Sequence, residues 1–146
     1  MKWLIKGGRV IDPHNQIDDL MDIYIQQGKI QDIRPVPLKR TLKLISDYRV
    51  IPAEGLVVVP GLIDMHTHLR EPGFEYKETI LSGTQAAVAG GCTAVVCMAN
   101  TDPVNDNQSV TKYILNKAKE AGCARVFPVG AISQGLKGEA LAEYGE

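Results

Sequence analysis

Two histidines, His66 and His68, stand two residues apart at the end of an apolar run, residues 62–65. In an extended strand, residues i and i+2 point to the same face, so both imidazoles can converge on one metal ion. Neutral imidazole is a preferred zinc ligand, and a hydrolytic zinc keeps one position open for water. Two histidines on one face more often hydrogen-bond within the protein than bind metal, so the spacing alone leaves both interpretations open.

The residues around this pair resemble the mouth of a barrel strand. Pro60 and Gly61 mark a sharp turn into the strand, and residues 70–73 form a turn-rich loop after it. The histidines therefore fall at the C-terminal end of a parallel strand, where α/β barrels place their active sites. The pattern predicts a metal-dependent hydrolase.

Two further polar residues lie near the predicted mouth. Arg70 comes two residues after His68, and a guanidinium there can hold a carboxylate by two parallel hydrogen bonds. Taken alone, an arginine before Glu-Pro-Gly is more often a surface salt-bridge partner. Asn100 ends the next predicted strand, and its alternative role is that of a turn residue in Asn-Thr-Asp-Pro.

The remaining candidates are interpreted mainly as structural. Asp64 shares the strand face of the two histidines, so it is either a third ligand or, as we favour, a group that orients an imidazole or has a structural role. Asp102 and Asp106 lie near the mouth, and Asp106 is expected to cap a helix. Glu71 is expected to be solvated or paired with a basic neighbour, and His14 to lie in a surface turn.

The composition argues against several functions. Sixteen basic and seventeen acidic side chains give a formal net charge of −1, which offers no field to hold nucleic acid or an anionic membrane. No apolar run approaches about 20 residues, and charges interrupt the start too early for a signal peptide, so we expect a cytoplasmic protein without a membrane partner. Cys92, Cys97 and Cys123 have no Cys-x-x-Cys spacing and are expected to be reduced structural thiols.

The pattern of residue types divides the chain near residue 58. Residues 1–58 are predicted to be β-rich, and residues 59–146 alternate strand and helix, which indicates βα units around a parallel sheet. In the first part, an alternation over residues 21–25 predicts one buried and one solvated face. The predicted strands of the first part cover residues 3–5, 21–25, 29–33, 42–45 and 56–59.

The second part is predicted to contain about three βα units. The expected strands cover residues 62–68, 94–98 and 125–132. The expected helices cover residues 76–89, ending at Gly90-Gly91, and 108–121, capped by Asp106 or Asn105 and ending at Gly122. A complete (β/α)₈ barrel needs about 250 residues. With 146 residues, and an apparent helix start over 138–144, the chain is expected to be an N-terminal portion.

A series of motifs runs in order along the whole chain. It comprises Gly7-Gly8-Arg9-Val10-Ile11-Asp12-Pro13, His-x-His-x-Arg-Glu-Pro-Gly at residues 66–73, Ala89-Gly90-Gly91-Cys92-Thr93, and Asn100-Thr101-Asp102-Pro103 followed by Asp106-Asn107. The series resembles the amidohydrolase superfamily and, within it, the dihydroorotases of the bacterial class I type. Ala99 departs from the family, which usually has proline there, and should relax the backbone more than it alters the chemistry.

The resemblance implies a fold and a set of site residues. The fold is a (β/α)₈ barrel, of which residues 59–146 are the first units, preceded by part of a small β-sandwich over residues 1–58. His66 and His68 would bind the more buried metal of a site with one or two Zn²⁺, and Arg70 and Asn100 the α-carboxylate of dihydroorotate. The family's other ligands and its catalytic Asp are expected beyond Glu146, so no catalytic residue is identified in this chain.

The implied activity is a zinc-dependent cyclic amide hydrolysis that interconverts dihydroorotate and N-carbamoyl-aspartate in de novo pyrimidine biosynthesis. This chain by itself is expected to be inactive. One alternative is a non-catalytic structural partner of aspartate transcarbamoylase, with which some class I dihydroorotases associate. Another is a hydantoinase- or allantoinase-type amidohydrolase, although those families lack an arginine at the place of Arg70. The expected partners are the small-molecule substrate, further copies in a homo-oligomer and aspartate transcarbamoylase.

Overall fold

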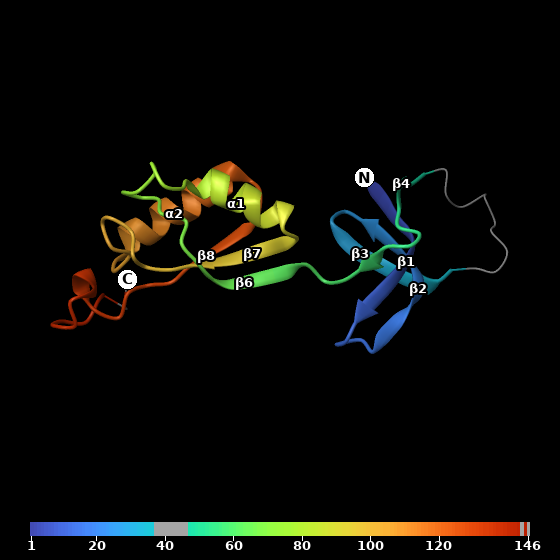
Figure 1. Cartoon of the computed structure of the whole chain (residues 1–146), viewed down its shortest axis with the longest axis horizontal. Coiled ribbons are helices and arrows are strands. Elements are labelled where there is room, and N and C mark those ends of the chain that lie inside the picture. The colour runs from blue at the N-terminus through green and yellow to red at the C-terminus, as the bar shows by residue number, and fades with distance from the viewer. Residues whose placement is uncertain (37–46, 144, 146) are drawn as a thin grey trace. The chain divides into compact units, whose positions relative to one another are not determined.

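A computed structural model describes residues 1–36, 47–143 and 145 of the chain (Figure 1). The chain divides into two compact units, Met1–Pro60 and Gly61–Glu146. The first unit contains a β-sheet, and the second contains a parallel sheet with two helices. The predicted strand over 42–45 lies outside the described residues.

The first unit is built on a five-stranded sheet. Its path runs β3-β2-β1-β4, with β5 also paired to β1. Both pairings of β2 are antiparallel, and β1 pairs in parallel with β4 and β5. Gln27 and Gly28, with φ of 53° and 73°, form the tight turn of the β2–β3 hairpin. The strands are β1 Lys2–Asp12, β2 Ile17–Gln26, β3 Lys29–Pro35, β4 Arg49–Pro52 and β5 Val57–Val58.

The prediction of a solvated face on β2 is wrong at Asp22, whose exposed fraction is 4%. The register of β1 shifts between Ile5 and Gly8, and this irregularity frees the amide of Gly7 from the ladder. That amide donates to Asp22 Oδ1 at 2.8 Å. The carboxylate is buried because it satisfies a backbone donor that the sheet leaves unpaired. The described strands of this unit form a single sheet, so the β-sandwich stays a prediction.

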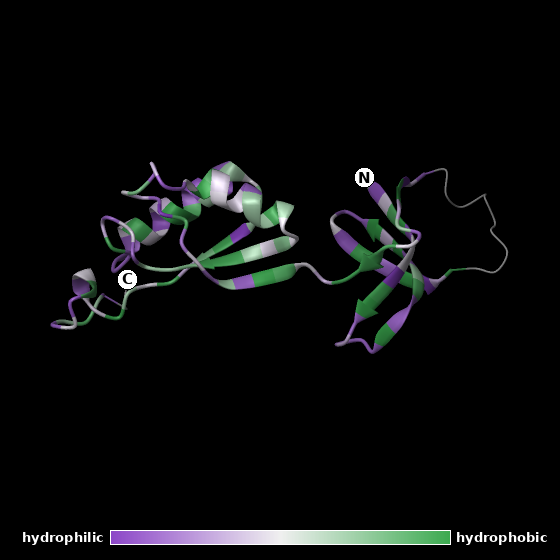
Figure 2. Ribbon diagram, in the orientation of Figure 1, coloured by the Kyte–Doolittle hydropathy of each residue, from purple (hydrophilic) through white to green (hydrophobic). Residues whose placement is uncertain are grey.

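The second unit has the predicted α/β organisation. Three parallel strands lie in the order β6-β7-β8, and both helices cover the same face of this sheet (Figure 1). Hydrophobic residues make up most of β7, whereas β6 and α2 contain both hydrophobic and hydrophilic residues (Figure 2). The elements are β6 Leu62–Thr67, α1 Ile80–Ala89, β7 Cys92–Cys97, α2 Gln108–Ala121 and β8 Arg125–Pro128.

The core of this unit lies between the sheet and the helices. Apolar side chains from both helices meet Val95, Cys97 and Val126 of the sheet and Leu69 of the loop after β6. On β6 itself, Ile63 and Met65 are 59% and 75% exposed in the chain. In the part of the chain that the structure describes, no helix is long and apolar enough to cross a membrane.

The first helix begins later than the sequence indicates, whereas the second begins where it is predicted but has a different cap. The first starts at Ile80 and not at residue 76, because the Thr79 hydroxyl accepts from the Ser82 amide and forms a capping box. The second is capped by Asn107, whose amide oxygen accepts from the amides of Ser109 and Val110 at 3.0 and 3.2 Å. Neither predicted cap, Asp106 or Asn105, occupies that position. The predicted glycine ends are confirmed at Gly90, which caps the first helix, and at Gly122, where φ is 63°.

The chain after β8 turns instead of forming the expected helix. The strand ends at Pro128, four residues earlier than predicted, and a short 3₁₀ turn covers Gln134–Leu136. Gly135, Leu136 and Gly138 have positive φ of 59°, 60° and 75°, which an α-helix excludes. The turn folds the segment back, so that Ser133 forms an isolated antiparallel bridge with Leu141.

Candidate functional site

β6 carries His66 and His68 at its C-terminal end, where the two imidazoles lie together. His66 is the last residue but one of the strand, and His68 follows its end directly. The two ring centroids are 5.2 Å apart, and the ring planes meet at 66°. The His66 amide donates to Asp64 Oδ1 at 3.1 Å, so Asp64 supports the strand backbone. Both imidazoles are exposed and close enough to face one cation.

Asn100, in the loop after β7, contacts the second imidazole. Its Oδ1 lies 2.9 Å from His68 Nδ1. With the amide oxygen as acceptor, Nδ1 carries the proton and Nε2 keeps its lone pair for a ligand. A hydrogen bond at the second ring nitrogen is a common support of metal-binding imidazoles. The NH₂ group of Asn100 still has donors to offer.

Arg70 occupies a turn directly after β6. The Glu71 amide donates to Leu69 O at 2.8 Å, which closes a three-residue turn centred on Arg70. Arg70 has φ of 63°, a left-handed conformation that costs a non-glycine residue about 1–3 kcal/mol. Its side chain is half-buried. The sequence predicts the position of Arg70 after the strand but not this constrained backbone.

The loops after β6 and β7 touch through their backbones. The Asp102 amide donates to Pro72 O at 3.0 Å. A Cβ added to Gly73 would lie 2.2 Å from Asp102 O, and its φ is 96°. Only glycine allows this approach without a shift of the backbone. The contact keeps the Asn100 loop beside the His68 loop.

Glu71 and Asp106 have partners that the sequence does not predict. Glu71 is 8% exposed and accepts from the Ile80 amide at 2.8 Å and the Tyr113 hydroxyl at 3.0 Å, so the expectation of a solvated or ion-paired side chain is wrong. Asp106 accepts from the Gly135 amide at 2.7 Å. That bond, and then one from Asn107, lower the pKa of Asp106. Asp106 therefore stays ionised and holds the loop after β8.

Asn105 is a buried hub that sequence reasoning missed. Its side-chain amide donates to Val129 O at 2.8 Å and accepts from the Thr111 hydroxyl at 2.7 Å. Its backbone donates to Ala99 O at 3.0 Å and accepts from the Ala131 amide at 2.8 Å. With an exposed fraction of 1%, Asn105 joins the loops after β7 and β8 to α2. No periodicity in the sequence identifies a buried polar residue of this kind, and the sequence alone suggested that Asn105 caps a helix.

Other potential ligands are not gathered at this site. Among residues 1–36, 47–143 and 145, no group of three or more His, Cys, Asp or Glu side chains is arranged to hold a metal. His14 is exposed in the turn after β1, as expected, and its amide donates to Asp12 Oδ1. Burial raises the pKa of the Cys97 thiol to about 11, so this thiol stays protonated near neutral pH.

Curated proteins similar to the whole chain are dihydroorotases. The dihydroorotase of Geotalea daltonii (strain DSM 22248 / JCM 15807 / FRC-32) is 57% identical over 146 residues, which cover 100% of this chain and 33% of that protein. The dihydroorotase of Geobacter metallireducens (strain ATCC 53774 / DSM 7210 / GS-15) is 56% identical with the same coverage. The chain thus spans about a third of the length of these relatives.

Solved structures and a family model agree with these relatives. The chain is similar to an L-hydantoinase (dihydropyrimidinase) from Arthrobacter aurescens, with a TM-score of 0.71 and 20% identity over 89% of this chain and 28% of that one. It is also similar to a D-hydantoinase (dihydropyrimidinase) from Thermus sp., with a TM-score of 0.58 and 30% identity over 80% of this chain and 24% of that one. The fold is therefore a fragment of an amidohydrolase barrel, as predicted. Residues 55–146 match the model described as "Dihydro-orotase-like", and the chain belongs to that family.

Proposed function

We propose that the protein, at its natural length, is a zinc-dependent dihydroorotase. It would interconvert dihydroorotate and N-carbamoyl-aspartate in de novo pyrimidine biosynthesis. The observation that carries the proposal is the cluster at the end of β6 and β7, where His66 and His68 lie with ring centroids 5.2 Å apart and Asn100 contacts the second ring. Family membership supplies the reaction class.

The histidine pair fits a borderline-soft divalent metal. Both rings are exposed at one strand end, and the Asn100 contact leaves His68 Nε2 as the ligating atom. Zinc bound there would supply a Lewis acid and a water of lowered pKa. Two imidazoles are half of a tetrahedral ligand set, so His66 and His68 are proposed as part of the metal site.

Arg70 and Asn100 are proposed to hold the substrate carboxylate. A guanidinium forms two parallel hydrogen bonds with a carboxylate, and Arg70 lies two residues after His68. The amide oxygen of Asn100 contacts His68, and its NH₂ group is left as a donor. This residue would therefore connect the metal-binding imidazole to the bound substrate. No described residue is assigned a proton-transfer role.

The decisive experiment measures metal and turnover together. The natural-length protein is purified and its zinc content is determined. Chromatography then follows both the hydrolysis of dihydroorotate and its formation from N-carbamoyl-aspartate. We expect turnover that is lost on chelation and recovered with zinc. Metal-replete, folded protein without turnover of dihydroorotate would contradict the proposal.

A second candidate function is hydrolysis of an uncharged cyclic amide. The observation that favours it is the 30% identity with the D-hydantoinase (dihydropyrimidinase) from Thermus sp.. Hydantoin and dihydrouracil lack the carboxylate that Arg70 is proposed to bind. Comparing kcat/KM for dihydroorotate and dihydrouracil therefore separates the two functions, and we expect dihydroorotate to be preferred.

The cellular context is also a proposal. We expect a cytoplasmic homo-oligomer, with aspartate transcarbamoylase as a partner. A role as a non-catalytic partner of that enzyme predicts co-purification without turnover. Size-exclusion chromatography with light scattering, with and without aspartate transcarbamoylase, tests both forms of association.

A further inference from the structure

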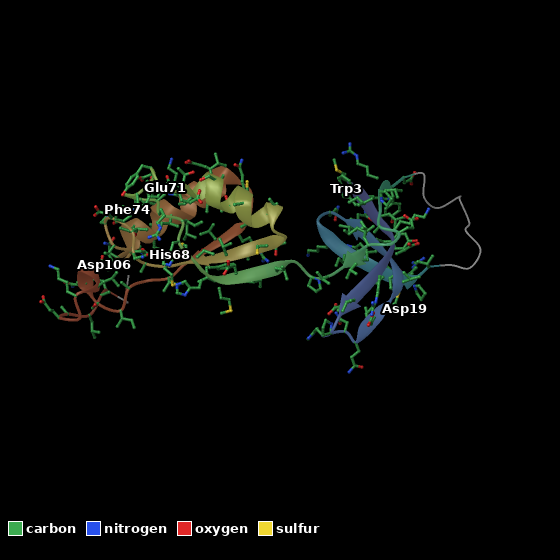
Figure 3. All side chains as sticks on the ribbon, in the orientation of Figure 1. Trp3, Asp19, His68, Glu71, Phe74 and Asp106 are labelled. Carbon is green, nitrogen blue, oxygen red and sulfur yellow. The ribbon has the colours of Figure 1, made fainter. Side chains whose placement is uncertain are left out.

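The buried carboxylate of Glu71 lies immediately after the proposed substrate-binding arginine. Its two oxygens have different partners, the Ile80 amide at 2.8 Å and the Tyr113 hydroxyl at 3.0 Å. The first partner is the first residue of α1, and the second belongs to α2. Glu71 lies beside the helices, whereas His68 lies at the end of the sheet (Figure 3). One side chain thus fixes the loop after β6 to both helices.

The helix end favours this arrangement. Thr79 satisfies the amide of Ser82, and Glu71 satisfies the amide of Ile80, so two free donors of the first turn have partners. A negative charge at a helix N-terminus also interacts favourably with the helix dipole. Desolvation, and then the hydrogen bond to Glu71, raise the pKa of Tyr113, which therefore remains a donor at neutral pH.

Arg70 is held between two buried neighbours. Leu69 is 5% exposed and packs in the core, and Glu71 is 8% exposed and bonded to the helices. The turn between them closes with the 2.8 Å bond from the Glu71 amide to Leu69 O. Arg70 itself has the left-handed φ of 63°. Such a conformation persists only where the surrounding structure enforces it, and Leu69 and Glu71 are the groups that do so.

We propose that Glu71 is a positioning residue for substrate binding: its buried carboxylate holds the strained turn that directs the Arg70 guanidinium toward the substrate carboxylate. This inference rests on the proposed function for its kinetic consequence. It assigns Glu71 no contact with substrate or metal. Its effect passes through Arg70, and the experiments below use that dependence.

The first experiment is a double-mutant cycle in the natural-length protein. Glu71→Gln keeps the size of the side chain but replaces one of its two acceptor oxygens by an NH₂ group. That group cannot accept a hydrogen bond from Ile80 or Tyr113. We expect KM for dihydroorotate to rise about 10-fold, equal to about 1.4 kcal/mol, with kcat and zinc content nearly unchanged. In an Arg70→Lys background, the same substitution should change KM less than twofold, because the guanidinium that Glu71 positions is already absent.

The controls separate positioning from general stability. Tyr113→Phe removes one of the two bonds and should raise KM by a smaller factor. Glu139→Gln makes the same chemical change at an exposed position and should leave KM unchanged. A parent without dihydroorotate turnover contradicts the proposed function. An active parent in which Glu71→Gln leaves KM unchanged, or raises it equally in both backgrounds, contradicts the positioning role.

A second measurement does not depend on turnover. Hydrogen exchange followed by mass spectrometry measures how fast the backbone amides of residues 69–82 exchange. These include the amide of Glu71, which donates to Leu69 O, and the amide of Ile80, which donates to the Glu71 carboxylate. We expect faster exchange in this segment for Glu71→Gln, and parent-like exchange for Glu139→Gln. Unchanged exchange in the Glu71→Gln protein would overturn the inference even if the parent hydrolyses another substrate.

Discussion

Replacement of Gly73 by alanine should separate the two loops that form the proposed site. The added Cβ would lie 2.2 Å from Asp102 O, 2.5 Å from Asp102 Cβ and 2.8 Å from Asp102 C. These atoms belong mostly to the backbone, so no side-chain rotation relieves the clash. Either Gly73 or Asp102 must move, and the 3.0 Å bond from the Asp102 amide to Pro72 O is lost.

The cost of this substitution has two parts. An L-residue at the Gly73 φ of 96° costs about 1–3 kcal/mol. Forcing a methyl group into a closed contact costs about 1–3 kcal/mol more. Gly91→Ala is the matched control, because Gly91 has φ of 85° and a Cβ there meets nothing within 4 Å. The control therefore carries the conformational cost without the clash.

Denaturant unfolding and dihydroorotate kinetics of the natural-length protein measure the two consequences. We expect Gly73→Ala to lower the free energy of unfolding by about 1–3 kcal/mol more than Gly91→Ala. We also expect kcat/KM to fall up to about 100-fold for Gly73→Ala alone, since a shift of about 1 Å in a positioning group has effects of that size. Equal losses of stability and activity in the two variants would refute the role assigned to the loop contact.

Four further outcomes are expected. His66→Ala or His68→Ala should abolish zinc binding and turnover with the fold intact by circular dichroism, whereas unchanged zinc content would contradict ligation. Arg70→Lys should weaken dihydroorotate binding by roughly 10- to 150-fold, from about 1.5–3 kcal/mol, because an ammonium cannot form the planar two-bond fork; an unchanged KM would remove this arginine from the substrate site. The folded pKa of Asp106 is lowered, so its stabilising contribution is present above its unfolded pKa and lost as pH falls through the folded value. Asp106→Asn should therefore flatten the acid limb of a stability–pH curve, and an unaltered curve would argue against the Gly135 bond. The 146-residue chain alone should bind zinc weakly and show no turnover, since two imidazoles half fill a tetrahedral site; activity in mass-verified chain would contradict this.

The strands and helices of the second unit were predictable because their signals are local. The apolar run predicts a strand over 94–98, where the structure has Cys92–Cys97, and the helix ended by Gly122 follows from residue type and spacing. The cap of the second helix was less predictable, because Asn105, Asp106 and Asn107 are all capable caps. The structure uses the third, since the first two have partners in the loop after β8.

The site was predictable only in part, for a physical reason. The spacing of His66 and His68 predicts that they share one face of the strand, and the structure places their rings together. The contact of His68 with Asn100 joins residues 32 positions apart, and no local pattern encodes it. Glu71 likewise reaches across 42 positions to Tyr113. Pairings of this length depend on how the βα units pack, which composition and periodicity do not specify.

The residues proposed to bind metal and substrate differ from those that hold the surrounding loops in place. His66, His68 and Asn100, the proposed ligand-binding residues, are exposed, and exposed side chains are poorly fixed by packing. The residues that hold the surrounding loops, Glu71 beside Arg70 and Asn105 after Asn100, are buried polar groups, whose burial is tolerable only because hydrogen bonds satisfy them. Each of these residues binds backbone atoms of a neighbouring element and so fixes where a loop runs. The geometry of the mouth therefore depends on hydrogen bonds beneath the loops, and a loss there displaces the exposed groups without altering any of them.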